Sequence, residues 1–290
     1  MEKLLLLALV GLVAQLVDGT LGMAYGLSSA TLLLAFGFAH TVISASVHAA
    51  ELVTTFASGA AHWHFKNTDA RTAAILAVPG AIGAFAGATV LASVDGAVAR
   101  PMVSAILFGL GALLLFTLSR GRRPVTNRRP LSRRFLGPLG LVAGFIDATG
   151  GGGWGPVTTP ALLAKGEAPN KTVGSVDTAE FAVAAAATLG FLLTSGPEVF
   201  NLPWVAALMA GGLVAAPVAA WLVSRMPHQL LGVLIAGVIL LTNLRTLLSH
   251  FAAPTDVSFA LYLLVLVAWG MGFWLMRRRQ TGAALPDLAA

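Results

Sequence analysis

The sequence predicts an all-α polytopic membrane protein with two inverted-topology repeats, broken or re-entrant short helices and one extra C-terminal helix. Three observations support this prediction: charge is scarce, long apolar stretches recur, and the two halves match each other. Only 10% of the 290 residues are charged and 57% are hydrophobic, whereas an ordinary soluble domain carries about a quarter charged residues. The composition therefore excludes a soluble enzyme, a disordered tail and a nucleic-acid module, and it indicates helices in a bilayer.

The apolar stretches differ in length, and the length predicts which of them span the membrane. A spanning helix needs about 20 residues. The stretches at 4–17, 21–38, 135–148 and 152–164 are short, so we expect broken or re-entrant helices there. The stretches that are long enough occupy residues 42–61, 71–92, 98–118, 172–195, 202–224, 228–249 and 257–276.

The sequence matches itself when it is shifted by 129 residues. Of the 47 positions that begin at Gly11, 18 are identical without a gap. The match pairs Asp18 with Asp147 and Glu51 with Glu180, and composition does not account for these pairs because acids are rare in this chain. Each half holds five apolar stretches, or three spans if a short pair forms a re-entrant hairpin. Either number is odd, so the second half enters the membrane from the opposite face.

The repeats also predict the organisation of the chain. Inverted repeats with short, glycine-interrupted segments at matching positions are typical of secondary transporters, which bind their substrate near the bilayer midplane. We expect a first membrane repeat at 1–118, a basic cytoplasmic linker at 119–134, a second membrane repeat at 135–250, an extra transmembrane helix at 251–276 and a cytoplasmic tail at 277–290.

Lysine and arginine predict the orientation. Seven arginines lie in the linker, and cytoplasmic loops carry an excess of basic residues. A cytoplasmic linker places the N-terminus outside and the C-terminus in the cytoplasm. The net charge of +6 then reflects topology and contact with anionic headgroups, so we expect the lipid bilayer, and no nucleic acid, as a partner. The oligomeric state stays open.

Four segments carry a family resemblance: Gln15–Gly26, Ser44–Glu51, Gly144–Pro156 and Gly174–Glu180. With them the chain resembles the TauE/SafE family of sulfite and organosulfur anion exporters over nearly its whole length. The resemblance implies movement of a small anion, sulfite or an organosulfonate, across a bacterial-type inner membrane. The first half departs from the glycine-rich pattern of the second, with Leu21, Met23 and Ala24 where the second half has glycines.

The glycine run before Trp154 is the first candidate for substrate binding. Irregular backbone survives in a membrane only where protein or a water-filled cavity surrounds it. A helix that starts here points free N–H groups at an anion; the alternative is a helix-packing device made of small residues. Together with equivalent and nearby positions, the predicted substrate-binding residues are Gly22, Tyr25, Ser46, Gly151, Gly152, Gly153, Trp154, Ser175 and Thr178.

Asp18 and Asp147 lie where the short helices end and the glycines begin. An acid inside the membrane is costly and is a functional candidate by default, so each of them can exchange protons or bind a cation. The alternative is that each caps the next helix. A charged carboxylate repels an anion, which favours the structural role unless the carboxylate is protonated.

Glu51 and Glu180 lie within long apolar stretches. His48 and Asp177 precede them by three residues, so each pair shares a helix face. Buried carboxylates can exchange protons near neutral pH, and we hypothesise that these groups couple anion movement to proton movement. The alternative is a protonated, hydrogen-bonded contact between helices.

The remaining motifs narrow the function. His62 and His64 flank Trp63, and histidines two apart are poor metal ligands on a helix, so we expect interfacial anchoring there. No Walker A, HExxH, GxSxG or dinucleotide-binding pattern occurs, so the sequence predicts no enzyme, cofactor or resident metal. The sequence therefore predicts a secondary transporter that works by alternating access. The alternatives are a channel-like anion conduit and a membrane subunit or scaffold without transport of its own.

Overall fold

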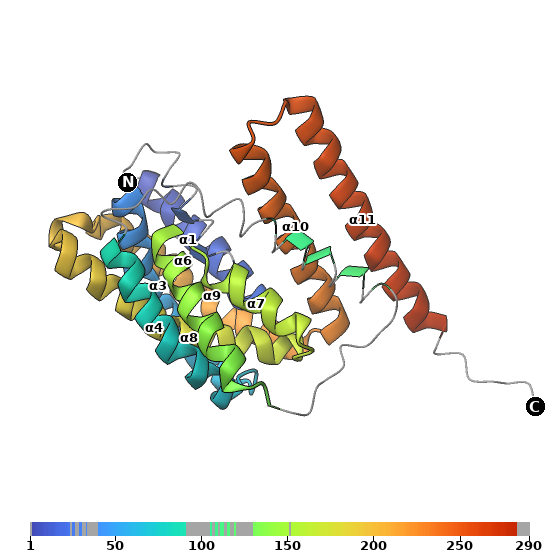
Figure 1. Cartoon of the computed structure of the whole chain (residues 1–290), viewed down its shortest axis with the longest axis horizontal. Coiled ribbons are helices and arrows are strands. Elements are labelled where there is room, and N and C mark those ends of the chain that lie inside the picture. The colour runs from blue at the N-terminus through green and yellow to red at the C-terminus, as the bar shows by residue number, and fades with distance from the viewer. Residues whose placement is uncertain are drawn as a thin grey trace, which may run out of the picture. The chain divides into compact units, whose positions relative to one another are not determined.

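The computed structural model describes residues 2–23, 25–26, 29–30, 33, 40–90, 105, 108–109, 111–112, 115–116, 119, 130–150 and 152–282. Within these residues the chain is all-helical, with nine α-helices and one short 3-10 helix, η1 (Figure 1). In chain order they are α1 Glu2–Leu21, α3 His40–His64, α4 Ala70–Val90, α6 Arg133–Gly150, α7 Trp154–Ala164, α8 Pro169–Ser195, η1 Pro197–Val199, α9 Leu202–Arg225, α10 His228–His250 and α11 Thr255–Gly282.

Six of the described helices are long and apolar enough to cross a membrane, namely α1, α4, α8, α9, α10 and α11. The prediction that the first apolar stretch is too short to span was wrong. Helix α1 has 20 residues, about 30 Å at 1.5 Å per residue, because polar residues at both ends extend it beyond the apolar run. Helix α7 is short, with 11 residues. The expected stretches 21–38 and 98–118 fall largely outside the described residues.

Glycine turns end the two repeat-equivalent helices α1 and α6. Gly22 has a φ of 69° and its N–H donates to Asp18 O at 2.5 Å, an arrangement that closes a helix where only glycine is unstrained. Gly152 has a φ of 139° and its N–H donates to Asp147 O at 3.2 Å. The turns therefore place an aspartate on the last turn of each helix.

The chain forms two compact units, and each draws on both halves of the sequence. The first comprises residues 1–96, 128–159 and 170–225, and the second comprises 97–127, 160–169 and 226–290. In the second unit α11, the expected C-terminal helix, packs on α10. The Trp269 indole N–H there donates to Val233 O at 2.8 Å.

In the first unit α1 packs along α9, and α4 packs along α6. Because the repeat relates α1 to α6 and α4 to α9, the two pairs correspond to each other. Gly11 and Gly140 are repeat equivalents that lie against the carbonyl oxygens of Leu208 and Leu76. Each pair therefore joins a helix of one repeat to a helix of the other.

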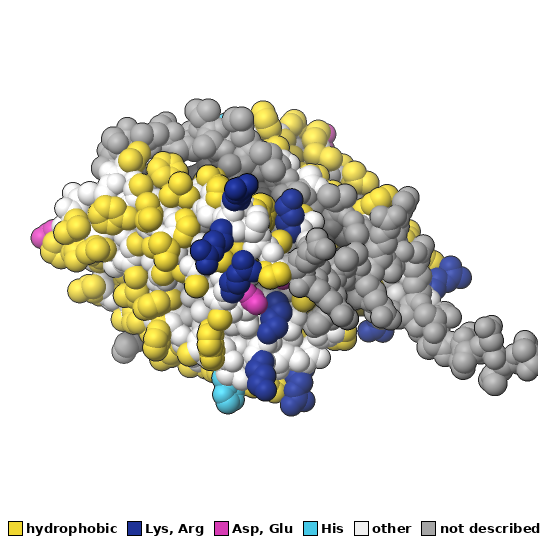
Figure 2. Space-filling model, turned by 60° about the horizontal axis from the view of Figure 1, so that its bottom comes forward, with side chains coloured by type: hydrophobic (Ala, Val, Ile, Leu, Met, Phe, Trp, Pro, Cys, Tyr) yellow, Lys and Arg dark blue, Asp and Glu magenta, His cyan; other side chains and the backbone are white. Residues whose placement is uncertain are grey.

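Basic side chains gather on one face, beside a wide surface of hydrophobic side chains (Figure 2). Lys171, near the start of α8, donates to Lys66 O at 2.8 Å. Helices α4 and α6 run in the same direction, because Leu76 lies beside Gly140 and Gly87 beside Phe145. The basic residues at the starts of α4, α6 and α8 therefore lie toward the same end of the first unit.

Candidate functional site

Two buried groups of side chains lie inside the first unit, and the 129-residue repeat relates them member by member. We call His48, Glu51 and Asp147 the histidine cluster, and Asp18, Asp177 and Glu180 the carboxylate cluster. In each cluster one ligand atom from every member lies within 4.8 Å of the others. Each cluster combines the aspartate on the last turn of α1 or α6, in one repeat, with two helix residues of the other repeat.

His48 bridges the members of the histidine cluster. Its Nε2 lies 3.0 Å from Asp147 Oδ2 and 4.0 Å from Glu51 Oε2, and its Nδ1 lies 2.7 Å from Ser44 O. A carbonyl oxygen and a carboxylate only accept hydrogen bonds, so both ring nitrogens act as donors. The geometry therefore fits an imidazolium that compensates the two carboxylates.

Asp147 is fully engaged. Its Oδ1 accepts from the backbone N–H groups of Gly153 at 2.6 Å and Trp154 at 2.9 Å, while Oδ2 faces His48. Asp147 therefore caps the start of α7. Capping was the alternative to a functional role in the sequence analysis. The N–H groups of Gly153 and Trp154, which we expected to face an anion, are therefore occupied by a carboxylate of the chain itself.

The carboxylate cluster has fewer partners. Asp18 Oδ1 accepts from Tyr25 N at 3.5 Å, and Asp177 Oδ2 accepts from the Ser58 hydroxyl. The Asp18 and Asp177 side chains also interact with each other, and no N–H or hydroxyl group among the described residues donates to Asp18 Oδ2 or Asp177 Oδ1. Asp18 is 1% exposed, Asp177 0% and Glu180 5%, so bulk solvent does not reach these carboxyl groups.

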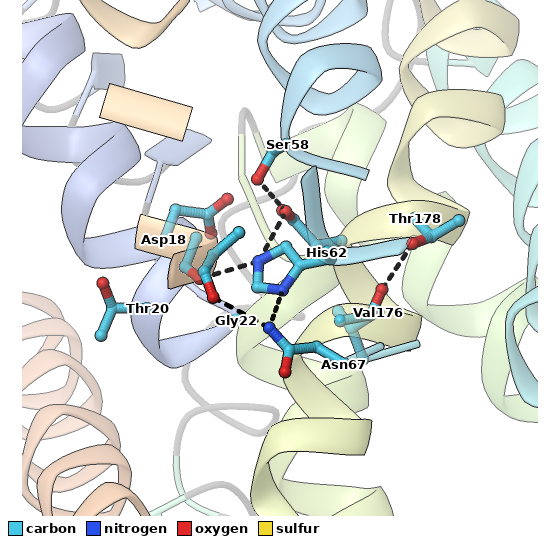
Figure 3. Close-up of polar contacts among 12 residues, drawn as sticks. Asp18, Thr20, Gly22, Ser58, His62, Asn67, Val176 and Thr178 are labelled. Atoms are coloured by element: carbon cyan, nitrogen blue, oxygen red, sulfur yellow. Dashed lines mark hydrogen bonds and ion pairs between the residues drawn. The ribbon is translucent and has the colours of Figure 1, made fainter. Parts of the chain in front are cut away.

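His62 lies beside this cluster but adds no charge to it (Figure 3). Its Nε2 donates to Gly19 O at 2.9 Å and lies 3.4 Å from Asp177 Oδ2. Its Nδ1 accepts from Asn67 Nδ2, whose orientation is set by a second bond to Ala220 O at 2.9 Å. A nitrogen that accepts carries no proton, so these contacts describe a neutral imidazole.

The burial of His62 corrects the prediction of interfacial anchoring, which fails for this residue although Trp63 is exposed. The sequence analysis did not place Gln15, Ser58 or His62 in the site. A comparison of the repeats could have identified these three residues, because each is polar where its repeat equivalent is not. These pairs are Gln15/Gly144, Ser58/Ala187 and His62/Phe191.

Ser175 and Thr178 both contact the loop before α4, whereas the predicted Ser46 lies apart from them. Ser46 accepts from Asn201 N at 3.1 Å, at the loop before α9. Ser175 accepts from Asp69 N at 2.8 Å, at the loop before α4, and Thr178 donates to Gly174 O. The two serines therefore hold equivalent loops, one in each repeat.

Trp154 and Tyr25 are buried repeat equivalents with different partners. The Trp154 indole N–H donates to Val176 O at 3.0 Å, whereas no group among the described residues meets the geometry of a hydrogen bond to the Tyr25 hydroxyl. Gly22 O accepts from Thr159 at 2.6 Å. Gly151 lies outside the described residues, and its predicted role stays a prediction.

Buried ionisable groups in a membrane protein are candidates for a functional site, and comparison with known proteins identifies the class of protein. The family model described as "Sulfite exporter TauE/SafE" matches residues 7–246. The chain is 52% identical over 272 residues to "Probable membrane transporter protein YtnM" of Bacillus subtilis (strain 168), a match that covers 93% of this chain and 91% of that protein. No solved structure matches.

The chain therefore belongs to the TauE/SafE sulfite exporter family. It is an integral membrane transporter and not an enzyme.

Proposed function

We propose that the chain is a secondary carrier that moves a small sulfur-containing anion, sulfite or an organosulfonate, by alternating access. The observation that carries this proposal is the pair of repeat-related clusters buried in the first unit of a TauE/SafE chain. Charged groups inside a membrane protein mark substrate and ion pathways by default. Two related sites, each shared between repeats, fit a mechanism in which one repeat rocks against the other.

Helix directions support an inverted relationship of the repeats. Helix α1 runs with α3, because Gly19 at its end contacts His62 at the end of α3. Helix α6 begins at the same end as α4, which follows the end of α3, and its last turn returns to His48 in the first half of α3. Repeat-equivalent α1 and α6 therefore run in opposite directions, as inverted repeats require.

The Tyr25 hydroxyl is the best-placed anion donor among the predicted binding residues. It is buried with the Thr54 side chain beside it, but no group among the described residues meets the geometry of a hydrogen bond to it. An unsatisfied buried donor costs about 1–3 kcal/mol. An anion oxygen that accepts from this hydroxyl removes that cost. The indole N–H of the equivalent Trp154 already donates to Val176 O. We therefore propose that the anion contact lies in the first repeat.

The test is transport by purified protein in liposomes with a panel of sulfite, sulfate, thiosulfate, sulfoacetate and taurine. We expect saturable uptake and counterflow of at least one sulfur-containing anion, and a weaker apparent affinity for Tyr25→Phe without loss of folded protein. Linear flux without counterflow would favour a channel. No flux of any member would favour a membrane subunit or scaffold.

A further inference from the structure

We propose that Asp18, Asp177 and Glu180 form a binding site for a hard metal cation, which the amide of Gln15 borders. The site adds to the proposed function and rests on it in one respect. A cation bound here would offset the negative charge of the acids, which otherwise repels a transported anion. The inference itself comes from the contrast between the two clusters.

The first argument is the difference in charge between His48 and its repeat equivalent, Asp177. Position 48 holds a histidine that bridges Asp147 and Glu51, whereas its repeat equivalent is Asp177. The carboxylate cluster therefore has three acids where the histidine cluster has two acids and a cation. Buried carboxylates are tolerated when they are protonated, paired with a cation or bound to a metal, and the neighbouring His62 supplies no cation because it is a neutral donor in this arrangement.

The second argument is geometric. Carboxylate oxygens bind Ca²⁺ at about 2.3–2.6 Å, so two oxygens on opposite sides of one ion lie about 4.6–5.2 Å apart. One oxygen from each of the three acids lies within 4.8 Å of the others. A single ion can therefore contact all three, in the place that corresponds to the imidazole of His48.

The third argument comes from a side chain outside the acids. Gln15 is 0% exposed, and neither its amide nitrogen nor its amide oxygen has a partner among the described residues. A Cβ atom on Gly19 would lie 3.4 Å from Gln15 Nε2 and 3.2 Å from Ser58 Oγ, and Ser58 is bonded to Asp177. The Gln15 amide group thus lies near Ser58, the partner of Asp177, and a rotation of the amide by about 180° would turn its oxygen to this side as a neutral ligand.

The fourth argument is the polarity around the two clusters. The carboxylate cluster is bordered by Gln15, Ser58 and His62, whose repeat equivalents are a glycine, an alanine and Phe191. On the other side, the Phe191 ring lies 6.0 Å from the His48 ring, centroid to centroid. The histidine cluster thus holds an internal cation, with the Phe191 ring and the Ser44 hydroxyl beside it. The carboxylate cluster holds no cation and is bordered by polar groups that suit a bound ion.

The test is cation-dependent stability of the purified full-length protein, which requires no transport. The midpoint of thermal unfolding is measured in choline, sodium, potassium and calcium chloride at equal ionic strength. A cation that binds only the folded protein raises the midpoint with the logarithm of its concentration. We expect this rise, relative to choline, for sodium or calcium.

Three variants locate the ion. Asp177→His copies the residue at position 48 and is expected to remove the rise, because its imidazole takes the place of the ion. Asp177→Asn keeps the size of the side chain and should weaken the rise, and it carries the test if Asp177→His does not fold. Glu198→Gln removes an exposed carboxylate in η1 and should leave the rise unchanged.

Two results would overturn the proposal. Equal midpoints in all four salts would show that protons alone neutralise the cluster, and a rise that persists in both Asp177 variants would place the ion elsewhere. The outcome is separable from the proposed function. A cation response without anion flux in liposomes would retain the site and reject the carrier, and flux without a cation response would do the reverse.

Discussion

At the scale of single residues, one difference between the repeats gives the two clusters different charges. Histidine at position 48 gives its cluster an internal positive charge, whereas aspartate at position 177 leaves the equivalent cluster with three acids. Each cluster holds one glutamate, Glu51 in the histidine cluster and Glu180 in the carboxylate cluster. Glu51 also interacts electrostatically with Asp177, and Glu180 with Asp147, so each glutamate interacts with an acid of the other cluster. A change of charge at either glutamate therefore alters the electrostatic environment of both clusters.

This arrangement predicts the effect of neutralising the glutamates. Glutamine resembles a protonated glutamate but cannot release a proton, so Glu51→Gln and Glu180→Gln should each flatten the pH dependence of anion uptake. The measurement is the initial rate of uptake into liposomes between pH 5.5 and 8.5 in steps of about 0.5, across the range in which buried carboxylates can titrate. Glu198→Gln, an exposed change outside the clusters, is the matched control. An unchanged pH profile in both cluster variants would reject proton coupling through these residues.

At the scale of helices, glycines set which segments pack together. A Cβ atom on Gly140 would lie 2.7 Å from Leu76 O, and one on Gly11 would collide with Leu208 O. Close approach of backbones through small residues is the usual way in which membrane helices associate. The equivalent glycines therefore define the α4–α6 and α1–α9 pairs, which in turn carry Asp147 and Asp18 to the clusters.

Alanine at these glycines should separate the paired helices. Gly11→Ala and Gly140→Ala are each expected to destabilise the protein by about 1–3 kcal/mol, the usual cost of overpacking. Gly270→Ala in α11 is the matched control, because no atom lies within 4 Å of its Cβ position and alanine favours a helix over glycine by about 1 kcal/mol. Thermal unfolding of the detergent-solubilised protein reports the difference. Equal midpoints for all three variants would contradict this account of the packing.

At the scale of the whole molecule, the distribution of basic residues predicts the orientation in the membrane. Lysines and arginines gather on one face (Figure 2), and the starts of α4 and α6 lie toward the same end of the first unit. The positive-inside rule places such an end in the cytoplasm. The linker at 119–134 and the tail at 277–290 are then cytoplasmic, and the N-terminus is outside.

The absence of cysteine from the chain makes this orientation simple to measure. Ser132 precedes α6 and Ser249 lies near the end of α10, and both are exposed. A membrane-impermeant maleimide should label Ser249→Cys in intact cells, and Ser132→Cys only in inside-out vesicles. The unmodified chain controls for background labelling. The reverse pattern would invert the predicted topology.

The sequence by itself determined the membrane setting, the positions of most described helices and the six members of the two clusters. It did so because charge is scarce, so each buried acid stands out, and because the 129-residue repeat identifies equivalent positions. The family resemblance, carried by the glycine and acid segments, was confirmed by the family model and by the Bacillus relative.

Only the tertiary structure shows which side chains of different helices contact each other. The sequence grouped Glu51 with His48 on one helix face, but not Asp147 with both, because that contact joins residues 99 positions apart. Ser46 and Ser175 lie at opposite loops, and His62 is buried, for the same reason. Local patterns determine where a helix forms and which side is polar, whereas the partner of a polar side is set by the packing of helices distant in sequence.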